Sequence, residues 1–211
     1  KKPLELLALL AAQGGRPLPA EAAIEALWPS LEANAPRASL DMAVSRLRKL
    51  LDVPDAVLLA EGRLQLNPAL CWTDVAAFEA RLQQAAAGEP TALADAVALY
   101  GAPLLGSQPL PGALQLRRQQ LAQQFAQAVI GHARQLAAGG QGEAACSLLQ
   151  QALLQEPLAE PLHRALIQVL LDTGEHAQAA QALQHCRLVL QRALGVPPSP
   201  ATQALLQRPG L

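Results

Sequence analysis

Hydrophobic and polar residues follow a helical period in the segment from Arg37 to Leu51. At about 100° per residue, one side of this helix collects large apolar residues and the opposite side collects small and cationic ones. The apolar stripe consists of Leu40, Val44, Leu47 and Leu51, and the opposite face consists of Ala38, Ser39, Met42, Ser45, Arg46 and Lys49. We therefore expect the stripe to be buried and the opposite face to be available to a partner.

The composition of this outward face suits the major groove of DNA. Small side chains let a helix enter the groove, and cations contact phosphates or guanine edges. The same pattern is also typical of an ordinary amphipathic helix whose charged face is solvated. The neighbouring segments favour the DNA interpretation.

Two shorter helices are predicted ahead of this one. Residues Pro3 to Gln13 carry apolar side chains at helical spacing and stop at Gly14-Gly15, a strong C-terminal signal. After a connection that includes Leu18, residues Pro19 to Trp28 open with proline and an early glutamate and stop before the next proline. A second connection, over 29–36, leads into the third helix. Three helices in about fifty residues are the count of a compact helix-turn-helix domain, with the third in the recognition position.

A tight hairpin is predicted directly after the third helix. The short runs 56–60 and 63–66 are separated by Glu61-Gly62, and glycine tolerates the positive φ that two-residue turns require. The pair is typical of a wing with Arg63 at its tip. This arginine would contact a phosphate or the minor groove, although a lone exposed arginine is often only solvated.

The order of these segments resembles the winged helix of OmpR-type regulators. More closely, it resembles the version that is fused to a bacterial transcriptional activation domain in SARP-like and MalT-like regulators. The motifs that carry the resemblance are LELLALLAAQGG, EALWP, ASLDMAVSRLRKLL and, most specifically, LQLNPALCWTDV followed by Phe78-Glu79. The resemblance covers essentially the whole chain. The DNA-binding residues on this interpretation are Arg37, Ser39, Met42, Ser45, Arg46, Lys49 and Arg63, with Arg37 and Arg63 on backbone phosphates.

Two features depart from the family pattern. The family's winged helix begins with a small antiparallel sheet, whereas this chain starts at Lys1-Lys2-Pro3 directly on the first helix, so we expect its amino end to be a fragment boundary. Asp41 also places a negative charge beside the proposed reading face, and the chain carries sixteen cations against seventeen anions. The overall charge therefore gives no support to DNA binding.

From Asp74 onward the sequence predicts helices only. The segment is rich in Ala, Leu and Gln, and clusters of glycine and proline divide it into helices of ordinary length. When Gly140 is laid on Gly174, an offset of 34 residues, small and large residues recur at the same places. The matched pairs are Ala145 with Ala179, Leu149 with Leu183, Ala152 with Cys186 and Leu136 with Leu170. The period is that of a tetratricopeptide repeat, although the usual early aromatic residues are absent.

The fold class that follows is mainly α: a winged helix-turn-helix with a β-hairpin wing, and then an all-α tetratricopeptide-like repeat domain. We place the first domain at residues 1–70 and the second at 71–211. Residues 74–208 resemble the family's activation domain, which implies that they serve contact rather than chemistry. Stacked helix pairs form a concave surface that holds peptides or neighbouring domains.

The sequence gives no sign of catalysis or metal binding. The four histidines, His132, His163, His176 and His185, lack a metal-ligand spacing and are interpreted as surface or packing residues. The isolated cysteines Cys71, Cys146 and Cys186 are interpreted as small buried residues of a reducing compartment. No apolar run is long enough to span a membrane, so a cytoplasmic location is expected. An aromatic content of 2% argues against a single-strand binder.

The sequence thus predicts a bacterial transcription regulator that binds promoter DNA through the winged helix. Its partners would be double-stranded DNA and, through the repeat, proteins such as RNA polymerase or an upstream sensor or ATPase module, with a homodimer as the natural way to strengthen binding. No cofactor, catalytic residue or metal is expected. The alternative is a protein-interaction scaffold that does not bind DNA, which the near-neutral charge favours.

Overall fold

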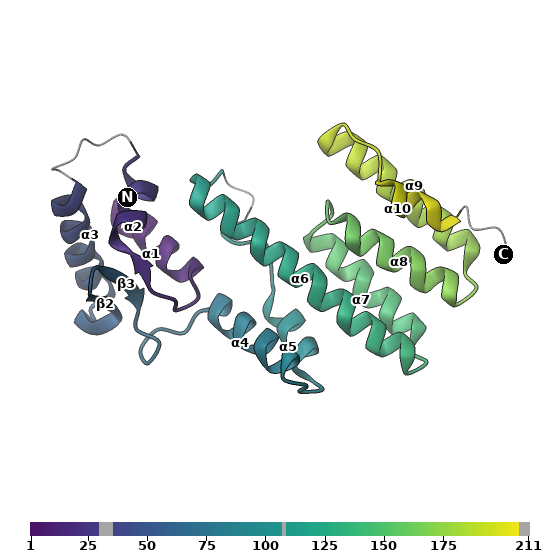
Figure 1. The fold of residues 1–211 in the computed structure, drawn as a ribbon, viewed down its shortest axis with the longest axis horizontal. Helices are drawn as coiled ribbons and strands as arrows, with labels where there is room; N and C mark the ends of the chain where they lie inside the picture. Colours follow the sequence, from purple (N-terminus) through teal and green to yellow (C-terminus); the bar gives the residue numbers. More distant parts are fainter. Residues whose placement is uncertain (30–35, 107–108, 207–211) are drawn as a thin grey trace. The chain divides into compact units, whose positions relative to one another are not determined.

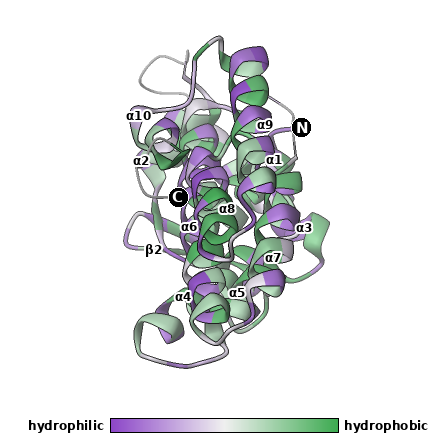
Figure 2. Ribbon diagram, turned by 90° about the vertical axis from the view of Figure 1, so that its right-hand side faces the viewer, coloured by the Kyte–Doolittle hydropathy of each residue, from purple (hydrophilic) through white to green (hydrophobic). Residues whose placement is uncertain are grey.

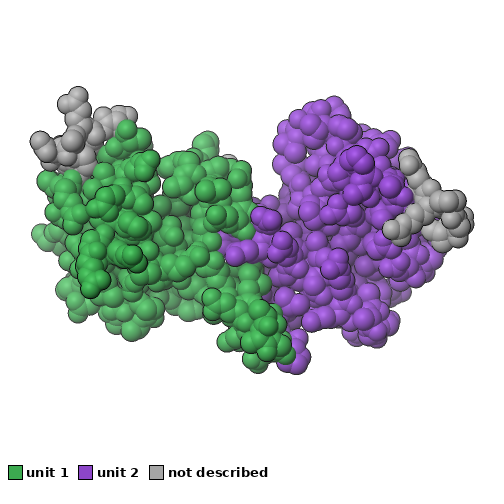
Figure 3. All heavy atoms as spheres, viewed as in Figure 1, with its two compact units in different colours: residues 1–89, 104–120 green, residues 90–103, 121–211 purple. Residues whose placement is uncertain are grey.

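A computed structural model describes residues 1–29, 36–106 and 109–206 of the chain (Figure 1). They form two compact units (Figure 3). Unit 1 comprises residues 1–89 and 104–120, and unit 2 comprises residues 90–103 and 121–211. These units are defined by contacts within the structure, and they divide the chain at other places than residue 70. The domain boundary that the sequence suggests at residue 70 stays a prediction.

In its described residues, unit 1 contains three helices and a small sheet, followed by one further helix and the beginning of a long one. The first part runs α1 (Lys2–Ala12), β1 (Leu18–Pro19), α2 (Ala20–Leu27), α3 (Pro36–Leu51), a 3₁₀ turn (Pro54–Ala56), β2 (Val57–Ala60) and β3 (Arg63–Leu66). It continues with α4 (Asp74–Ala86) and the start of α6 (Gly112–Ala138). The three predicted helices and the hairpin are confirmed, while most of the predicted connection over 29–36 lies outside the described residues.

The core of unit 1 contains the apolar stripe of α3. Leu40, Val44 and Leu47 are buried together with leucines of α1 and of the hairpin. Leu51, which we expected to be buried, is only half-buried because it lies in the last turn of the helix, although it still packs against this core. The prediction that one face of α3 is core is therefore confirmed, with Leu51 at its margin.

The sheet has a strand that the sequence analysis assigned to a connection. The strand order is β1-β3-β2, with Leu18 opposite Leu64 and Ala60 opposite Arg63, and both pairings are antiparallel. β1 lies at an edge of the sheet, where the missing backbone donor of Pro19 is tolerated. Pro19 consequently ends the strand and precedes α2, which begins at Ala20 rather than at Pro19.

Unit 2 is entirely helical in the part of it that the structure describes. It contains α5 (Ala92–Leu99), most of α6, α7 (Gly142–Gln155), α8 (Glu160–Asp172), α9 (His176–Leu194), α10 (Pro200–Gln203) and a 3₁₀ turn (Ala204–Leu206). The helix ends fall at the predicted glycine and proline breaks. Helices α7, α8 and α9 follow one another as a hairpin stack, in which α8 contacts both neighbours (Figure 1). Hydrophobic and hydrophilic segments alternate along their ribbons (Figure 2), as expected of helices that are buried on one face.

The 34-residue repeat corresponds to equivalent packing positions. The matched residues Ala145 and Ala179 are both fully buried, and so is Leu149. The matched residues Ala152 and Cys186 are also buried, with at most a few per cent of their surface exposed. Gly140 and Gly174 adopt φ of +78° and +81°, the left-handed conformation that turns one helix into the next without a Cβ penalty. The same residue types therefore perform the same structural task in both repeats.

Two of the three cysteines differ from their predicted environment, whereas the histidines are surface or packing residues as expected. Only Cys186 is buried, and burial raises the pKa of its thiol to about 11, which leaves it protonated and unreactive. Cys71 and Cys146 are half-buried, so the expectation that all three are buried was wrong for these two. His163 is buried, and its Nε2 lies 2.9 Å from the carbonyl oxygen of Pro157. His185 and Cys186 are neighbours in the sequence and lie on different sides of α9, because His185 is exposed and Cys186 is buried.

Among the described residues, none of the helices combines the length and the apolar composition needed to cross a bilayer.

Candidate DNA interface

The exposed face of α3 carries most of the predicted DNA-binding side chains. Met42 is 52% exposed, and Ser45, Arg46 and Lys49 are likewise exposed. Ser39, at the start of the face, is half-buried. These side chains lie opposite the buried stripe, so unit 1 uses one side of the helix for its core and leaves the other accessible.

Arg48 fixes the end of α3 to the wing. Its Nε and Nη2 atoms donate hydrogen bonds of 3.1 and 2.6 Å to the carbonyl oxygen of Val57, the first residue of β2. This half-buried guanidinium is therefore used inside the protein, in contrast to the exposed Arg46 and Lys49 on either side of it. The sequence pattern placed Arg46 and Lys49, but not Arg48, on the outward face. It could not predict the backbone acceptor of Arg48, because the hairpin brings Val57 to it.

The wing is a two-residue hairpin. Glu61 and Gly62 have φ of +51° and +71°, the pair of positive values that defines the turn whose twist matches antiparallel strands. The carbonyl of Gly62 also accepts a hydrogen bond from the amide of Ala20, 2.8 Å away, which ties the turn to the start of α2. Arg63 follows the turn and is exposed.

Two acidic residues modify the charge of this surface. Arg37, predicted to contact a phosphate, lies 3.9 Å from a carboxylate oxygen of Glu21 on α2, and both side chains are at least half exposed. Such a surface pair is worth little energy, so Arg37 can exchange Glu21 for a phosphate at small cost. Asp41 is exposed beside Met42 and lowers the positive potential of the face.

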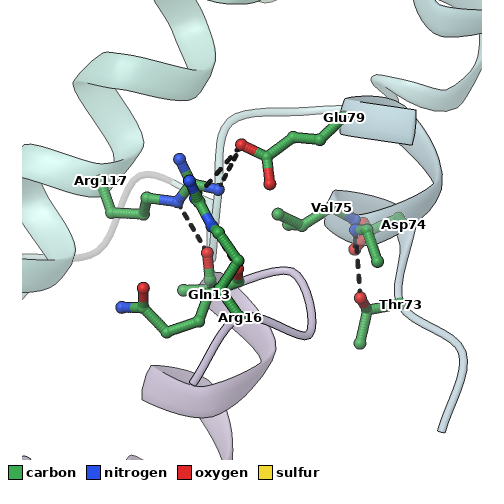
Figure 4. A network of polar contacts seen from close by, with 9 residues as sticks. Gln13, Arg16, Thr73, Asp74, Val75, Glu79 and Arg117 are labelled. Carbon is green, nitrogen blue, oxygen red and sulfur yellow. Dashed lines mark hydrogen bonds and ion pairs between the residues drawn. The ribbon is translucent and has the colours of Figure 1, made fainter. Parts of the chain in front are cut away.

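Within unit 1, a partly buried charge network joins the end of α1 to α4 and α6 (Figure 4). Arg117 of α6 is 6% exposed, donates a 2.7 Å hydrogen bond to the carbonyl of Ala12 and lies 2.8 Å from Glu79 of α4. Arg16 donates to the same Glu79 oxygen at 3.2 Å and to the carbonyl of Gln13 at 3.0 Å. The end of α1 is thus joined to α4 and α6 through one carboxylate.

Close packing accompanies this network. Gly14 has φ of +64°, and a Cβ at this position would lie 2.7 Å from a Glu79 oxygen and 3.1 Å from Val75. Leu114 of α6 is buried in the same core as the α3 stripe. The helices that support the candidate reading face therefore include segments far beyond the hairpin, and no local sequence pattern had connected Arg117 or Glu79 with the first three helices.

Across the described residues, no group of three or more His, Cys, Asp or Glu side chains is arranged to hold a metal ion. The polar residues of the candidate site are instead cations, hydroxyls and a thioether on one helix and one wing. This set can contact phosphates and base edges through hydrogen bonds and charge.

These elements define a winged helix followed by a helical repeat, and the chain belongs to a family with this organisation. Residues 73–208 match the family described as "Bacterial transcriptional activator domain". The chain is thus a member of a transcription regulator family and has the SARP-like organisation that the sequence motifs indicated. The family match begins at Thr73, the N-cap residue of α4. Its hydroxyl oxygen accepts a hydrogen bond from the backbone amide of Ala76.

The comparisons with individual proteins agree. The transcriptional regulatory protein EmbR of Mycobacterium tuberculosis and that of Mycobacterium bovis are each 29% identical to the chain over 226 residues. The alignment covers 96% of this chain but only 56% of EmbR, so the chain spans about half the length of these relatives. A solved structure of M. tuberculosis EmbR, in complex with a low affinity phosphopeptide, is similar with a TM-score of 0.64 at 26% identity, covering 98% of this chain and 58% of that one.

Proposed function

We propose that the chain binds promoter DNA by inserting α3 into the major groove, with the hairpin as a wing on the flanking backbone. The observation that carries this proposal is the division of α3 into a buried stripe and an exposed face of small and cationic residues. Arg46 and Lys49 would lie at the centre of the contact, bordered by Ser39, Met42 and Ser45. Arg37 and Arg63 would contact phosphates.

The repeat would supply the protein contacts of the regulator. A transcription regulator must act on other proteins once it is bound to DNA, and stacked helix pairs present extended surfaces for that purpose. We propose no catalytic role for the chain. Its partners would be DNA on unit 1 and a protein on unit 2.

The exposed Asp41 and the near-neutral charge of the chain point to a modest affinity for a single copy. Electrostatic attraction dominates non-specific binding, so little of it is expected here. Two copies on repeated half-sites would restore useful affinity without additional charge. The alternative function, a scaffold without DNA binding, is favoured by the same charge balance and is decided by the following experiment.

The experiment begins with a duplex selected by the chain from a randomised pool. Its binding, and that of a scrambled duplex, is measured by fluorescence anisotropy across a salt series. Arg46→Ala should weaken binding to the selected duplex by about 5- to 160-fold, corresponding to the loss of one base-reading arginine. Arg63→Ala should weaken both duplexes alike and lower the salt slope by about one, as a phosphate contact does.

Arg192→Ala is the matched control, because it removes the same charge from the exposed face of α9 in unit 2. It should leave both affinities unchanged. Failure to enrich any duplex, or an equal effect of Arg46→Ala and Arg192→Ala, would favour the scaffold function instead.

A further inference from the structure

Two histidines of unit 2 lie close together in a hollow of the helical stack. His163 belongs to the first turn of α8 and His185 to α9, and their ring centroids are 6.0 Å apart. Helix α8 packs against both α7 and α9 (Figure 1). The hollow that these helices leave has a volume of about 320 Å³, and both imidazoles line it. Two possible nitrogen ligands from neighbouring helices therefore meet at one place.

A hydrogen bond fixes the tautomer of His163. Its Nε2 lies 2.9 Å from the carbonyl oxygen of Pro157, and because a carbonyl oxygen only accepts, Nε2 carries the proton. In the neutral ring, the free lone pair is then on Nδ1. Histidines that bind metals are held in the same way, since a backbone carbonyl that accepts from one ring nitrogen orients the other toward the ion. The ring is also immobilised by packing, because His163 is 1% exposed.

The surroundings of His163 keep its ring neutral. Burial lowers the pKa of the imidazole, and the neighbouring His185 lowers it further. The hydrogen bond to Pro157 and the negative charge of Glu160 act in the opposite direction, but the pKa stays below its ordinary value. At pH 7 the ring is therefore in the unprotonated form that metal binding requires.

His185 is the adjustable member of the pair. Its side chain is exposed and makes no hydrogen bond within the described part of the chain, so its ring can rotate between staggered rotamers. Two imidazoles on one ion, each with a metal–nitrogen distance of about 2.0 to 2.1 Å, have ring centroids about 5 to 6.5 Å apart, depending on the angle at the metal. The observed separation of 6.0 Å lies in this range.

The other residues of the hollow narrow the choice of ion. Those that the structure describes are leucines, an alanine and glutamines, with neither a fixed cation that would repel a metal ion nor a carboxylate. Mg²⁺ and Ca²⁺ require several oxygen ligands, usually including carboxylates. Imidazole nitrogens instead suit Zn²⁺, Cu²⁺ and Ni²⁺. The donor set therefore selects a divalent transition metal.

We propose that Nδ1 of His163 and one ring nitrogen of His185 bind a single divalent transition-metal ion, with water in its remaining coordination positions. Two protein ligands leave such a site open, unlike the closed four-ligand sites of structural zinc. The ion would link α8 to α9 within the repeat. This site lies in unit 2 and does not depend on the DNA binding that we propose for unit 1.

Calorimetric titration of the 211-residue chain with Zn²⁺, Cu²⁺ and Mg²⁺ tests the choice of ion. Cu²⁺ should bind more tightly than Zn²⁺, as it does at nitrogen sites in general, and Mg²⁺ should not bind. Binding of Mg²⁺ as tight as that of Zn²⁺ would contradict an imidazole site.

Substitutions locate the site. His185→Gln should weaken Zn²⁺ binding at least about tenfold, because it removes one of the two protein ligands. His176→Gln is the matched control and should have no effect. Both variants replace an exposed histidine of α9, so neither disturbs the core, and only His185 is near His163. An equal effect of the two substitutions on Zn²⁺ affinity would overturn the proposal.

A measurement on the unmodified protein tests the role of His163, whose substitution could unfold unit 2. In ¹⁵N spectra of the imidazoles, Zn²⁺ should shift Nδ1 of His163 and one nitrogen of His185, while Nε2 of His163 keeps its proton. Unchanged His163 signals up to about 1 mM Zn²⁺, the weak end of specific affinity, would contradict the proposal. Loss of the Nε2 proton would also contradict it. Because DNA is absent, either result is distinct from a failure of DNA binding.

Discussion

At the scale of single residues, the two faces of α3 make different contributions. Leu47 is fully buried among the leucines of unit 1, while Met42, a side chain of similar size on the same helix, is half exposed. The first is needed for the fold and the second is available for a partner. This separation allows stability and DNA binding to be tested independently.

Leu47→Ala should lower the free energy of unfolding of unit 1 by about 2 to 5 kcal/mol, because it removes buried methyl groups and leaves a cavity. Met42→Ala should change it by less than about 0.5 kcal/mol, as surface substitutions do. Urea unfolding followed by tryptophan fluorescence reports on unit 1, since Trp28 and Trp72 are the two tryptophans of the chain and both belong to this unit. Similar losses for the two variants would mean that the faces are misassigned.

The residue patterns predicted much of this. Leucine and valine spacing was sufficient to find the buried face, and Glu61-Gly62 was sufficient to find the turn, because both depend on local backbone geometry. Arg48 and Arg117 could not be assigned in this way. Their roles depend on carbonyl groups of Val57 and Ala12, which are brought to them only by the tertiary fold.

At the scale of elements, polar contacts fasten short segments to helices. Glu160, in the first turn of α8, holds α10 through Ser199 and Thr202. Burial raises the pKa of this carboxyl, but the hydrogen bonds from the Ser199 hydroxyl, the Thr202 hydroxyl and the Ser199 amide, together with the charge of Arg164, outweigh it and lower the pKa below its ordinary value. The contacts therefore favour the ionised form.

A carboxyl whose pKa is lowered by folding stabilises the folded state above its ordinary pKa, and this contribution disappears as the pH falls through the lowered value. Glu160→Gln should thus reduce the hydrogen-exchange protection of α10 at pH 7. Charge-assisted hydrogen bonds contribute about 1.5 to 3 kcal/mol to stability. Because the carboxylate is partly exposed, we expect a loss of stability at the lower end of this range, which corresponds to about a tenfold loss of protection.

The difference between wild type and Glu160→Gln should shrink once the pH is below the ordinary carboxyl pKa, because the wild-type group is then progressively protonated. Glu143→Gln, at the exposed first turn of α7, is the control and should leave the protection of α10 unchanged. A difference between Glu160→Gln and wild type that persists unchanged under acidic conditions would show that the charge of Glu160 is not what holds α10.

The helices of the repeat could be predicted from their glycine and proline boundaries, and β1 could not. A two-residue edge strand that contains proline has no alternation to detect, and it becomes a strand only because β3 lies beside it. The groove between α6 and α8 could not be predicted either, since Arg134 and Arg164 are separated by a whole helix and line the same groove only because the repeats stack.

At the scale of the whole molecule, the chain combines a winged helix with a helical repeat, as expected of its family. The winged helix shares its core with Leu114 of α6, and α4 belongs to the same compact unit, so part of the matched family region contributes to the unit that carries α3. The sequence resemblance predicted the order of the modules. It could not predict this shared core, in which Leu114 joins the α3 stripe from more than sixty residues further along the chain.

The central claim is that α3 enters the major groove, and dimethyl sulfate protection of the selected duplex tests it most directly, because this reagent modifies guanine N7 in that groove. The account predicts that the wild-type chain protects guanines at the centre of the site and that Arg46→Ala removes protection at one base pair while leaving the rest of the footprint. Binding that leaves every guanine N7 as reactive as in free DNA would contradict the account.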